Sequence, residues 1–478
     1  MRIDHEAVDA AIWKLVAEQH LAGVSVCVKG RDGVLFEKGY GVRDAAGTPV
    51  DPDTMFGIAS MSKSITALAL CILQCDGRLT LDDPVYWYIP TFSVPGAARD
   101  AVTLRHLATH SAGIPPMEPL EWSIAMNSAL REGDCWQETM RRESPNQMDT
   151  IDQVIDYIAA CPYPMLGAPG EYMSYSNEGY AILSYVVDKA AGVPLEQFCR
   201  DRIFAPLGMT RTIMDDDCVS ARVLSGGNIT SLFESSDGVT RVDDDWSVLP
   251  PFRGCAMVKS TAGDMASYYC ALACGGMHEG RQAIPREAVS LLIGPAFPET
   301  ACDVYCLGLN KFVRHGRVFC EHSGGLHGVS TKGALIREEE LGFAVLCNQG
   351  DEDMDDIMWV LYSAVLGLPL DTCFRRFAPV NRAFADPQML LGTYIGHEGI
   401  PTHLTISLDE QGELHGERDG NAFTLVFCGA LRFLGYKHPG DRTPTARLEF
   451  FIRNGQAWGV RAGSRILQRE NTMKEAHR

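Results

Sequence analysis

The position of the strand patterns constrains the fold of this chain more than any other feature. Near the N-terminus, apolar and polar residues alternate around a Gly-Arg-Asp-Gly turn in AGVSVCVKGRDGVLFEKGYGVRD, which predicts a β-hairpin. Alternation returns late, in VYCLGLNKFVRHGRVFCEHSG and TKGALIREEELGFAVLCNQG, with helical patterns in between. This order predicts an α/β fold in which helices flank an antiparallel sheet assembled from both ends of the segment, with a helical region on one side.

The character of the chain changes near residue 372. The segment LPLDTCFRRFAPVNRAFADP is followed by short strand patterns separated by turns, and the pair Asn454-Gly455 is a strong hairpin signal. Many short strands in a short stretch indicate a small antiparallel barrel or sandwich. We therefore expect an α/β domain over residues 1–372, a linker over 373–388 and a β-barrel over 389–478.

Size and charge exclude several classes of function. The 478 residues exceed one ordinary core, and the formal net charge of −19 argues against a nucleic-acid partner. The sequence contains no run of about 18 apolar residues, so it predicts no membrane-spanning helix. The N-terminal stretch lacks the pattern of a signal peptide, and none of the 16 cysteines forms a Cys-x-x-Cys. We expect a cytoplasmic protein with reduced, buried thiols.

The stretch FGIASMSKSITALAL places a serine and a lysine at the start of an apolar helix. Ser60 and Lys63 stand three residues apart and therefore share one helical face. The helix dipole would stabilise a developing alkoxide on Ser60, and burial would disfavour the charged form of Lys63, so that its amine could act as a base. An N-cap serine followed by a solvated lysine explains the same residues. The motif alone does not separate the two explanations.

A second motif, in PGEYMSYSNEGYAIL, carries groups that acyl transfer can use. Tyr175 beside a lysine ammonium would lose its proton more easily, because the positive neighbour favours the phenolate. Asn177 offers both a donor and an acceptor to a substrate amide. The structural alternative is an asparagine helix cap with a tyrosine packed on the core.

A third motif, EHSGGLHG, follows a strand pattern. Here His322 precedes Gly324 and Gly325, and adjacent glycines let a substrate lie close to the strand backbone. The backbone N–H groups of Gly325 and Ser60 would then form an oxyanion hole. A glycine-rich hairpin turn is the structural alternative.

SMSK, YSN and HSG, in this order, resemble the motifs of the serine β-lactamase and penicillin-binding-protein superfamily, specifically its class C-like branch with D-aminopeptidases and esterases. The resemblance covers about residues 5 to 370 and includes the framing segments VTLRHLATHSAGIP, PGEYMSYSNEGY, IFAPLGMTRT and CAMVKSTAGDMASYYCALACGG. The C-terminal part resembles the small lipocalin-like domain appended to some related serine hydrolases.

The resemblance implies a role for each motif residue. Ser60 would be the acylated nucleophile and Lys63 its proton acceptor. Tyr175 would protonate the leaving group and then activate the deacylating water. Asn177 would hold the substrate amide, while His322 would orient the tyrosine and help to bind a substrate carboxylate or carbonyl. No cofactor and no metal ion are needed.

The resemblance therefore implies a serine hydrolase that cleaves an amide or ester bond, with a D-amino-acid-containing peptide as the leading substrate class and a small ester next. His-Ser-Gly in place of Lys-Thr-Gly removes a permanent ammonium and disfavours efficient penicillin hydrolysis. A true β-lactamase, a penicillin-binding sensor without turnover and a degenerate, non-catalytic scaffold are the alternatives. The expected partner is a small molecule or short peptide, and a homodimer remains open.

Three other features of the sequence allow more than one interpretation. His106 and His110 stand four apart in RHLATH, a spacing that could chelate a metal ion on a helix, but no third ligand follows and a structural role is favoured. The acidic cluster 351–356 fits the start of the following helix better than a calcium loop. The polar segment 117–149 has no clear period and is predicted to be an inserted flap or mobile helical segment that walls the pocket.

Overall fold

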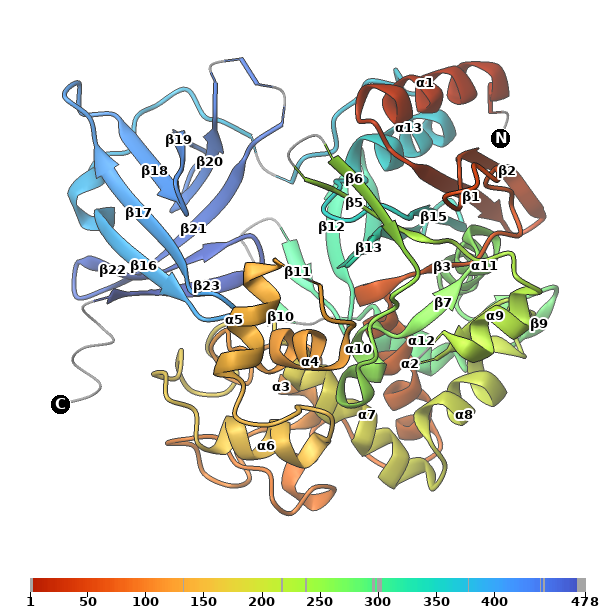
Figure 1. Cartoon of the computed structure of the whole chain (residues 1–478), viewed down its shortest axis with the longest axis horizontal. Helices are drawn as coiled ribbons and strands as arrows, with labels where there is room; N and C mark the ends of the chain where they lie inside the picture. Colours follow the sequence, from red (N-terminus) through yellow and green to blue (C-terminus); the bar gives the residue numbers. More distant parts are fainter. Residues whose placement is uncertain are drawn as a thin grey trace.

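The computed structural model describes residues 3–131, 133–215, 218–236, 239–294, 297–298, 303–376, 378–438, 440–441 and 443–470. Figure 1 shows two parts lying side by side, a larger one built from a sheet and helices and a smaller β-barrel at the left. Between residues 367 and 386 the described chain forms neither helix nor strand.

An antiparallel sheet of eight strands forms the centre of the larger part, in the order β10-β11-β12-β13-β14-β15-β1-β2. The N-terminal strands pair as the predicted hairpin, and β1 also pairs with β15, which places Val24 opposite Cys347. The prediction of a sheet assembled from both ends of the segment is confirmed. The strands are β1 (Gly23–Gly30), β2 (Gly33–Gly41), β10 (Phe297–Pro298), β11 (Asp303–Tyr305), β12 (Asn310–Arg314), β13 (Arg317–Leu326), β14 (Val329–Ile336) and β15 (Leu341–Cys347).

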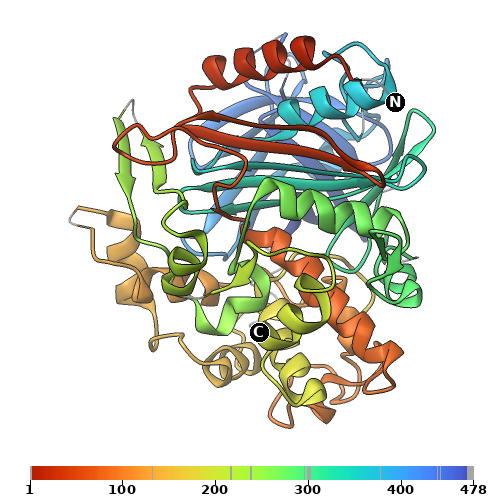
Figure 2. The same ribbon diagram turned by 90° about the vertical axis from the view of Figure 1, so that its right-hand side faces the viewer.

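Helices cover both faces of this sheet, as Figure 2 shows. On one face, α1 (His5–Glu18) and α13 (Asp355–Leu366) share an apolar cluster with the sheet. On the other face, α11 (Ala262–Ala273) packs against β14, β15 and β1. Strands β14 and β15 are consequently buried at every residue. The helix approaches so closely that a Cβ at Gly342 would lie 2.2 Å from the carbonyl oxygen of Ala266.

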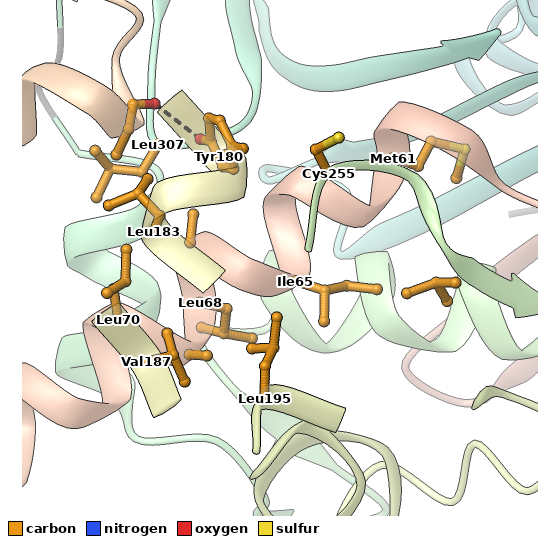
Figure 3. Close-up of a cluster of buried hydrophobic side chains, with 14 of the residues drawn as sticks. Met61, Ile65, Leu68, Leu70, Tyr180, Leu183, Val187, Leu195, Cys255 and Leu307 are labelled. Carbon is orange, nitrogen blue, oxygen red and sulfur yellow. Dashed lines mark hydrogen bonds between the residues drawn. The ribbon is translucent and has the colours of Figure 1, made fainter. Parts of the chain in front are cut away.

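A helical region lies beyond α11, with α2 (Ser62–Cys75) at its centre. Because α2 is apolar on all sides, it is buried from Ser62 to Leu73. Figure 3 shows Ile65 and Leu68 of this helix gathered with Val187 and Leu195 of its neighbours. The surrounding helices are α3 (Leu104–Ala108), α4 (Pro119–Asn127), α5 (Cys135–Glu143), α6 (Ile151–Ala159), α7 (Asn177–Ala191), α8 (Leu195–Cys199), α9 (Val219–Ser225), α10 (Arg253–Ala256) and α12 (Arg286–Leu292).

Several local predictions can be compared with these elements. The segment 117–149 forms two short helices, α4 and α5. The acidic cluster does open α13, with Asp355 and Asp356 in its first turn. No helix in the described part of the chain is both long and apolar enough to cross a lipid bilayer.

The smaller part is a closed antiparallel barrel of eight strands, as predicted. Asn454 and Gly455 have positive φ values of 52° and 78°, the conformation that a two-residue hairpin turn requires. The strands are β16 (Gly392–Gly396), β17 (Thr402–Leu408), β18 (Leu414–Arg418), β19 (Asn421–Phe427), β20 (Arg432–Tyr436), β21 (Ala446–Arg453), β22 (Gln456–Ala462) and β23 (Arg465–Arg469).

Candidate active site

Ser60 lies in a short 3₁₀ turn, Ala59–Met61, that leads directly into α2. Ala59 has φ 44°, a left-handed conformation that is strained for a residue with a Cβ. The turn presents the partly buried Ser60 side chain at the wall of a cavity, while the helix behind it is fully packed. Ser60 is therefore held at the start of a rigid helix.

The amine of Lys63 is completely buried and contacts three oxygen atoms. Lys63 Nζ lies 3.0 Å from Ser60 Oγ, 2.9 Å from Asn177 Oδ1 and 3.2 Å from the backbone oxygen of Cys255. The last two oxygens can only accept hydrogen bonds. In its neutral form, an amine at this place would satisfy these two acceptors with its two N–H groups and turn its lone pair toward the hydroxyl of Ser60. The arrangement is therefore one in which Lys63 could act as a base.

Asn177 is the first residue of α7, and Ser176 caps this helix by accepting a hydrogen bond from Gly179 N at 3.2 Å. The amide nitrogen of Asn177 donates to Glu398 Oε1 at 3.3 Å. Because a carboxylate only accepts, this contact supports the orientation in which Asn177 Oδ1 faces Lys63.

The ring of Tyr175 packs against Lys63, whose Nζ lies 4.8 Å from the ring centroid. It also packs on the imidazole of His110, with 4.3 Å between the centroids. Its hydroxyl is buried and has no hydrogen-bond partner among the described residues. The Tyr175 hydroxyl is thus free to interact with a bound substrate.

Strand β13 brings the third motif beside Ser60. A Cβ at Gly324 would lie 2.3 Å from the backbone oxygen of Ile58 and 3.1 Å from Ser60 N, so only glycine allows this approach. A Cβ at Gly325 would meet nothing within 4 Å, because this residue faces the cavity. The backbone of Gly325 therefore borders the same space as Ser60.

His322 forms its hydrogen bonds away from Tyr175. Its Nε2 lies 3.1 Å from Tyr305 Oη, and its Nδ1 lies 2.5 Å from the backbone oxygen of Ser323. Tyr305 Oη in turn lies 3.0 Å from Nε2 of His110. Burial lowers the pKa of His322 to about 3. Burial likewise holds the pKa of His110 well below its usual value. Both imidazoles are neutral at physiological pH.

The barrel contributes directly to this site. The backbone N–H of Tyr175 donates to the oxygen of Ser464 at 2.9 Å, and the guanidinium of Arg465 covers the Tyr175 ring at 4.9 Å from its centroid. Arg465 forms an ion pair with Glu398, which lies in the loop between β16 and β17. The apolar contact of Trp458 and Ile466 with Leu166 supports this docking. Two barrel loops therefore complete the pocket.

The resulting cavity has a volume of about 1290 Å³. Helices α4 and α5 form part of its wall, as predicted for the segment 117–149. Its lining holds many carboxylates but only three arginines. The carboxylates belong to Glu121, Asp134, Glu234, Asp243, Asp351, Glu352 and Glu398, and the guanidinium groups to Arg131, Arg241 and Arg465.

Glu121, on α4, is one of the carboxylates that line this cavity. It forms no hydrogen bond or ion pair with any described residue, and it packs against Gly399 of the barrel loop. Burial, with the charge of Glu398 adding to it, raises the pKa of Glu121 to about 7.

The structure does not place a metal-binding cluster among the described residues of the cavity. Helix α3 ends at Ala108, so His110 lies beyond the helix, and His106 Nδ1 accepts a hydrogen bond from Thr103 N. The described residues do hold one cluster with suitable ligand atoms, at the turn between β17 and β18 of the barrel, formed by Asp409, Glu413 and His415.

The structure brings all the predicted site residues together. Six of them line the cavity, namely Ser60, Tyr175, Asn177, His322, Gly324 and Gly325, and Lys63 lies directly behind Ser60. The site also contains residues that the sequence did not predict. These are His110 and Tyr305, Glu121 of α4, and Glu398, Ser464 and Arg465 of the barrel.

A serine hydroxyl beside a buried lysine amine, within this arrangement of sheet and helices, is a geometry that suits a serine hydrolase. The chain belongs to the beta-lactamase family, whose family model matches residues 8–366. Among curated proteins, Penicillin-binding protein 4* of Bacillus subtilis is 28% identical over 203 residues, covering 42% of this chain and 40% of that protein. Esterase EstB of Burkholderia gladioli is 29% identical over 205 residues, covering 42% and 49%. The chain thus spans less than half of these relatives.

Two of the similar solved structures cover nearly the whole chain, and a third covers about three quarters of it. SurE superposes with a TM-score of 0.70 at 22% identity, covering 97% of this chain and 98% of that one. The octameric penicillin-binding protein homologue from Pyrococcus abyssi gives 0.66 at 21% identity, covering 97% and 100%. D-amino acid amidase from Ochrobactrum anthropi SV3 gives 0.55 at 22% identity, covering 73% and 93%.

Proposed function

We propose that the protein forms an acyl-enzyme at Ser60 and hydrolyses an amide or ester bond of a small molecule or short peptide. The contact between Ser60 Oγ and Lys63 Nζ, at 3.0 Å, carries this proposal. Two carbonyl acceptors occupy the N–H groups of a neutral Lys63, so its lone pair takes the hydroxyl proton as the oxygen attacks the substrate carbonyl.

The remaining groups act on the intermediate. The N–H groups of Ser60 and Gly325 stabilise the oxyanion. Tyr175, whose hydroxyl has no partner among the described residues, protonates the leaving group and then activates the deacylating water. The amide of Asn177 keeps Lys63 in place and binds the substrate amide.

The charge of the cavity supports an aminoacyl substrate with a free ammonium group. Glu121 has no direct partner in the described part of the chain, and the third motif supplies a neutral histidine rather than a cation. An ammonium group on the substrate would pair with Glu121. The structures that share this fold include a D-stereospecific amidohydrolase from Streptomyces and a D-amino acid amidase. We infer that a D-aminoacyl amide or short D-peptide is the leading substrate and a small ester the next.

A β-lactamase and a penicillin-binding sensor are the alternatives. A class C beta-lactamase shares the fold at 19% identity, with a TM-score of 0.60. A neutral His322 offers no cation to the carboxylate of a penicillin, which favours slow acylation over turnover. Rapid, repeated hydrolysis of nitrocefin would favour the β-lactamase, and a single equivalent of product would favour the sensor.

Covalent labelling tests the proposal. A fluorophosphonate is expected to modify Ser60 in the intact protein, as mapped by peptide mass spectrometry, and Ser60→Ala should abolish labelling and turnover of D-aminoacyl amides and esters. Undiminished cleavage by this variant would overturn the proposal. A homodimer stays a prediction, which sedimentation of the full chain would test.

A further inference from the structure

The hydroxyl of Tyr305 lies between two imidazoles that belong to different parts of the site. His110 follows α3, Tyr305 ends β11 and His322 lies on β13, and all three side chains are buried. The distances along this series are 3.0 Å and 3.1 Å. The three side chains therefore form one hydrogen-bonded chain across the back of the cavity.

Backbone groups at the two ends fix the direction of this chain. Ser176 N donates to Nδ1 of His110 at 3.1 Å, so the neutral ring carries its proton on Nε2 and donates it to Tyr305. At the other end the oxygen of Ser323 accepts from Nδ1 of His322, so Nε2 of that neutral ring must accept from Tyr305. With both rings neutral, only this arrangement satisfies every donor and acceptor in the series.

This hydrogen-bonded series matters for catalysis because its two imidazoles help to position Tyr175. The Tyr175 hydroxyl has no hydrogen-bond partner in the described structure, so the backbone of Tyr175 and the packing of its ring set the position of this hydroxyl. His110 contacts this ring at 4.3 Å and His322 at 6.0 Å, measured between centroids. A change in either imidazole would therefore move the hydroxyl.

We propose that Tyr305 is a positioning residue of this hydrolase. Its hydroxyl holds both imidazoles in place and thereby seats the ring of Tyr175, a role that rests on the proposed function of that tyrosine. The same chain uses both ring nitrogens of His322, so this histidine has no free N–H for a substrate anion. The inference thus replaces the substrate-binding role expected for His322 with a structural one.

The variant Tyr305→Phe tests this inference because it removes one oxygen atom and keeps the ring. Nε2 of His110 and Nε2 of His322 would each lose a hydrogen-bond partner. We expect kcat for a D-aminoacyl amide to fall about tenfold with KM within about twofold, because a misplaced proton donor slows the chemical step more than binding.

A second readout follows the histidines directly. Without the Tyr305 donor, the neutral form of His322 loses a hydrogen bond, so its pKa should rise by up to about one unit. Nitrogen-15 spectra of the histidine rings recorded from pH 2 to pH 7 should show this shift. The groups that also face His322 and His110 are Lys63, Tyr175, Tyr180, Lys332, Arg376 and Arg465, and all of them are retained in the variant.

Tyr362→Phe is the matched control. Tyr362 is also buried, and its hydroxyl donates to Glu321 at 2.9 Å, but it does not belong to the hydrogen-bonded series of His110, Tyr305 and His322. It should lose similar stability and keep its kcat. The inference fails if Tyr305→Phe retains the wild-type kcat and histidine spectra, or if both variants lose kcat equally. If the fluorophosphonate does not label Ser60 in the wild type, the proposed function fails instead. The histidine spectra still decide whether Tyr305 is hydrogen-bonded to both imidazoles.

Discussion

Replacing Glu121 by glutamine tests the charge of the cavity. The substitution keeps the shape of the side chain and removes its charge. Burial, with the charge of Glu398 adding to it, raises the pKa of Glu121 from 4.5 to about 7. One unit of pKa corresponds to about 1.4 kcal/mol, so ionising Glu121 would cost the folded state at most about 3 kcal/mol. Its carboxylate faces the cavity, where solvent screens the charge, and we expect about 1–2 kcal/mol.

The sign of the effect depends on pH. Between pH 4.5 and about 7 the folded state retains a proton that the unfolded state has lost, so the free energy of unfolding falls as the pH rises through this window. The glutamine variant has no carboxyl group at this position, so its free energy of unfolding does not fall for this reason. It should match the wild type near pH 4 and exceed it above pH 7. Glu178, whose pKa burial also raises to about 7, titrates in both proteins and does not create the difference.

Urea unfolding at pH 4.5 and pH 8 measures the stability, and kcat/KM measures the function. For a D-aminoacyl p-nitroanilide with a free amine, we expect Glu121→Gln to lower kcat/KM by about 10- to 100-fold, as the loss of a charge-assisted hydrogen bond implies. For the N-acetylated counterpart we expect little change. A variant less stable than wild type at pH 8, or one that still cleaves the free amine equally well, would refute this reasoning.

Three further substitutions address other parts of the site. Lys63→Met should lower kcat by about 10³-fold while the chain stays folded, because it removes the base; wild-type turnover would contradict this. Gly324→Ala places a Cβ 2.3 Å from a backbone oxygen and should cost about 1–3 kcal/mol in thermal unfolding, whereas Gly325→Ala, with nothing within 4 Å, should leave stability unchanged. Arg465→Ala should lower kcat/KM about tenfold, since it uncovers Tyr175 and leaves a carboxylate unpaired; equal loss in the exposed-arginine control Arg418→Ala would count against it.

The sequence predicted the elements whose signals are local. Alternation in β1 and β2 and the Asn454-Gly455 pair are patterns of a few residues, and each identified its hairpin. Segment 117–149 was harder to assign, because α4 and α5 are short and are held by packing against each other rather than by a periodic pattern of their own.

In the candidate site, too, the contacts between residues close in sequence could be predicted, and those between distant residues could not. Ser60 and Lys63 are close in sequence, and one helical turn makes them neighbours. Tyr305 lies 195 residues from His110 and comes near it only through the sheet, so no sequence spacing announces their contact. His110 did stand out as a histidine four residues after His106, and a structural role was favoured over a metal site, but nothing in the sequence linked it to Tyr305 or Tyr175.

The contacts at the barrel loops link catalysis to the docking of the two parts of the chain. Tyr175 is held by Ser464 through its backbone and by Arg465 through its ring, while Asn177 donates to Glu398. If the barrel moved away, Tyr175 would lose both of these contacts, and the carboxylate partner of Asn177 would leave. Tyr175 would then have only its contacts with the larger part of the chain to hold it. The barrel is therefore part of the machinery that positions Tyr175, and substitutions at this interface should alter kcat before they unfold either part.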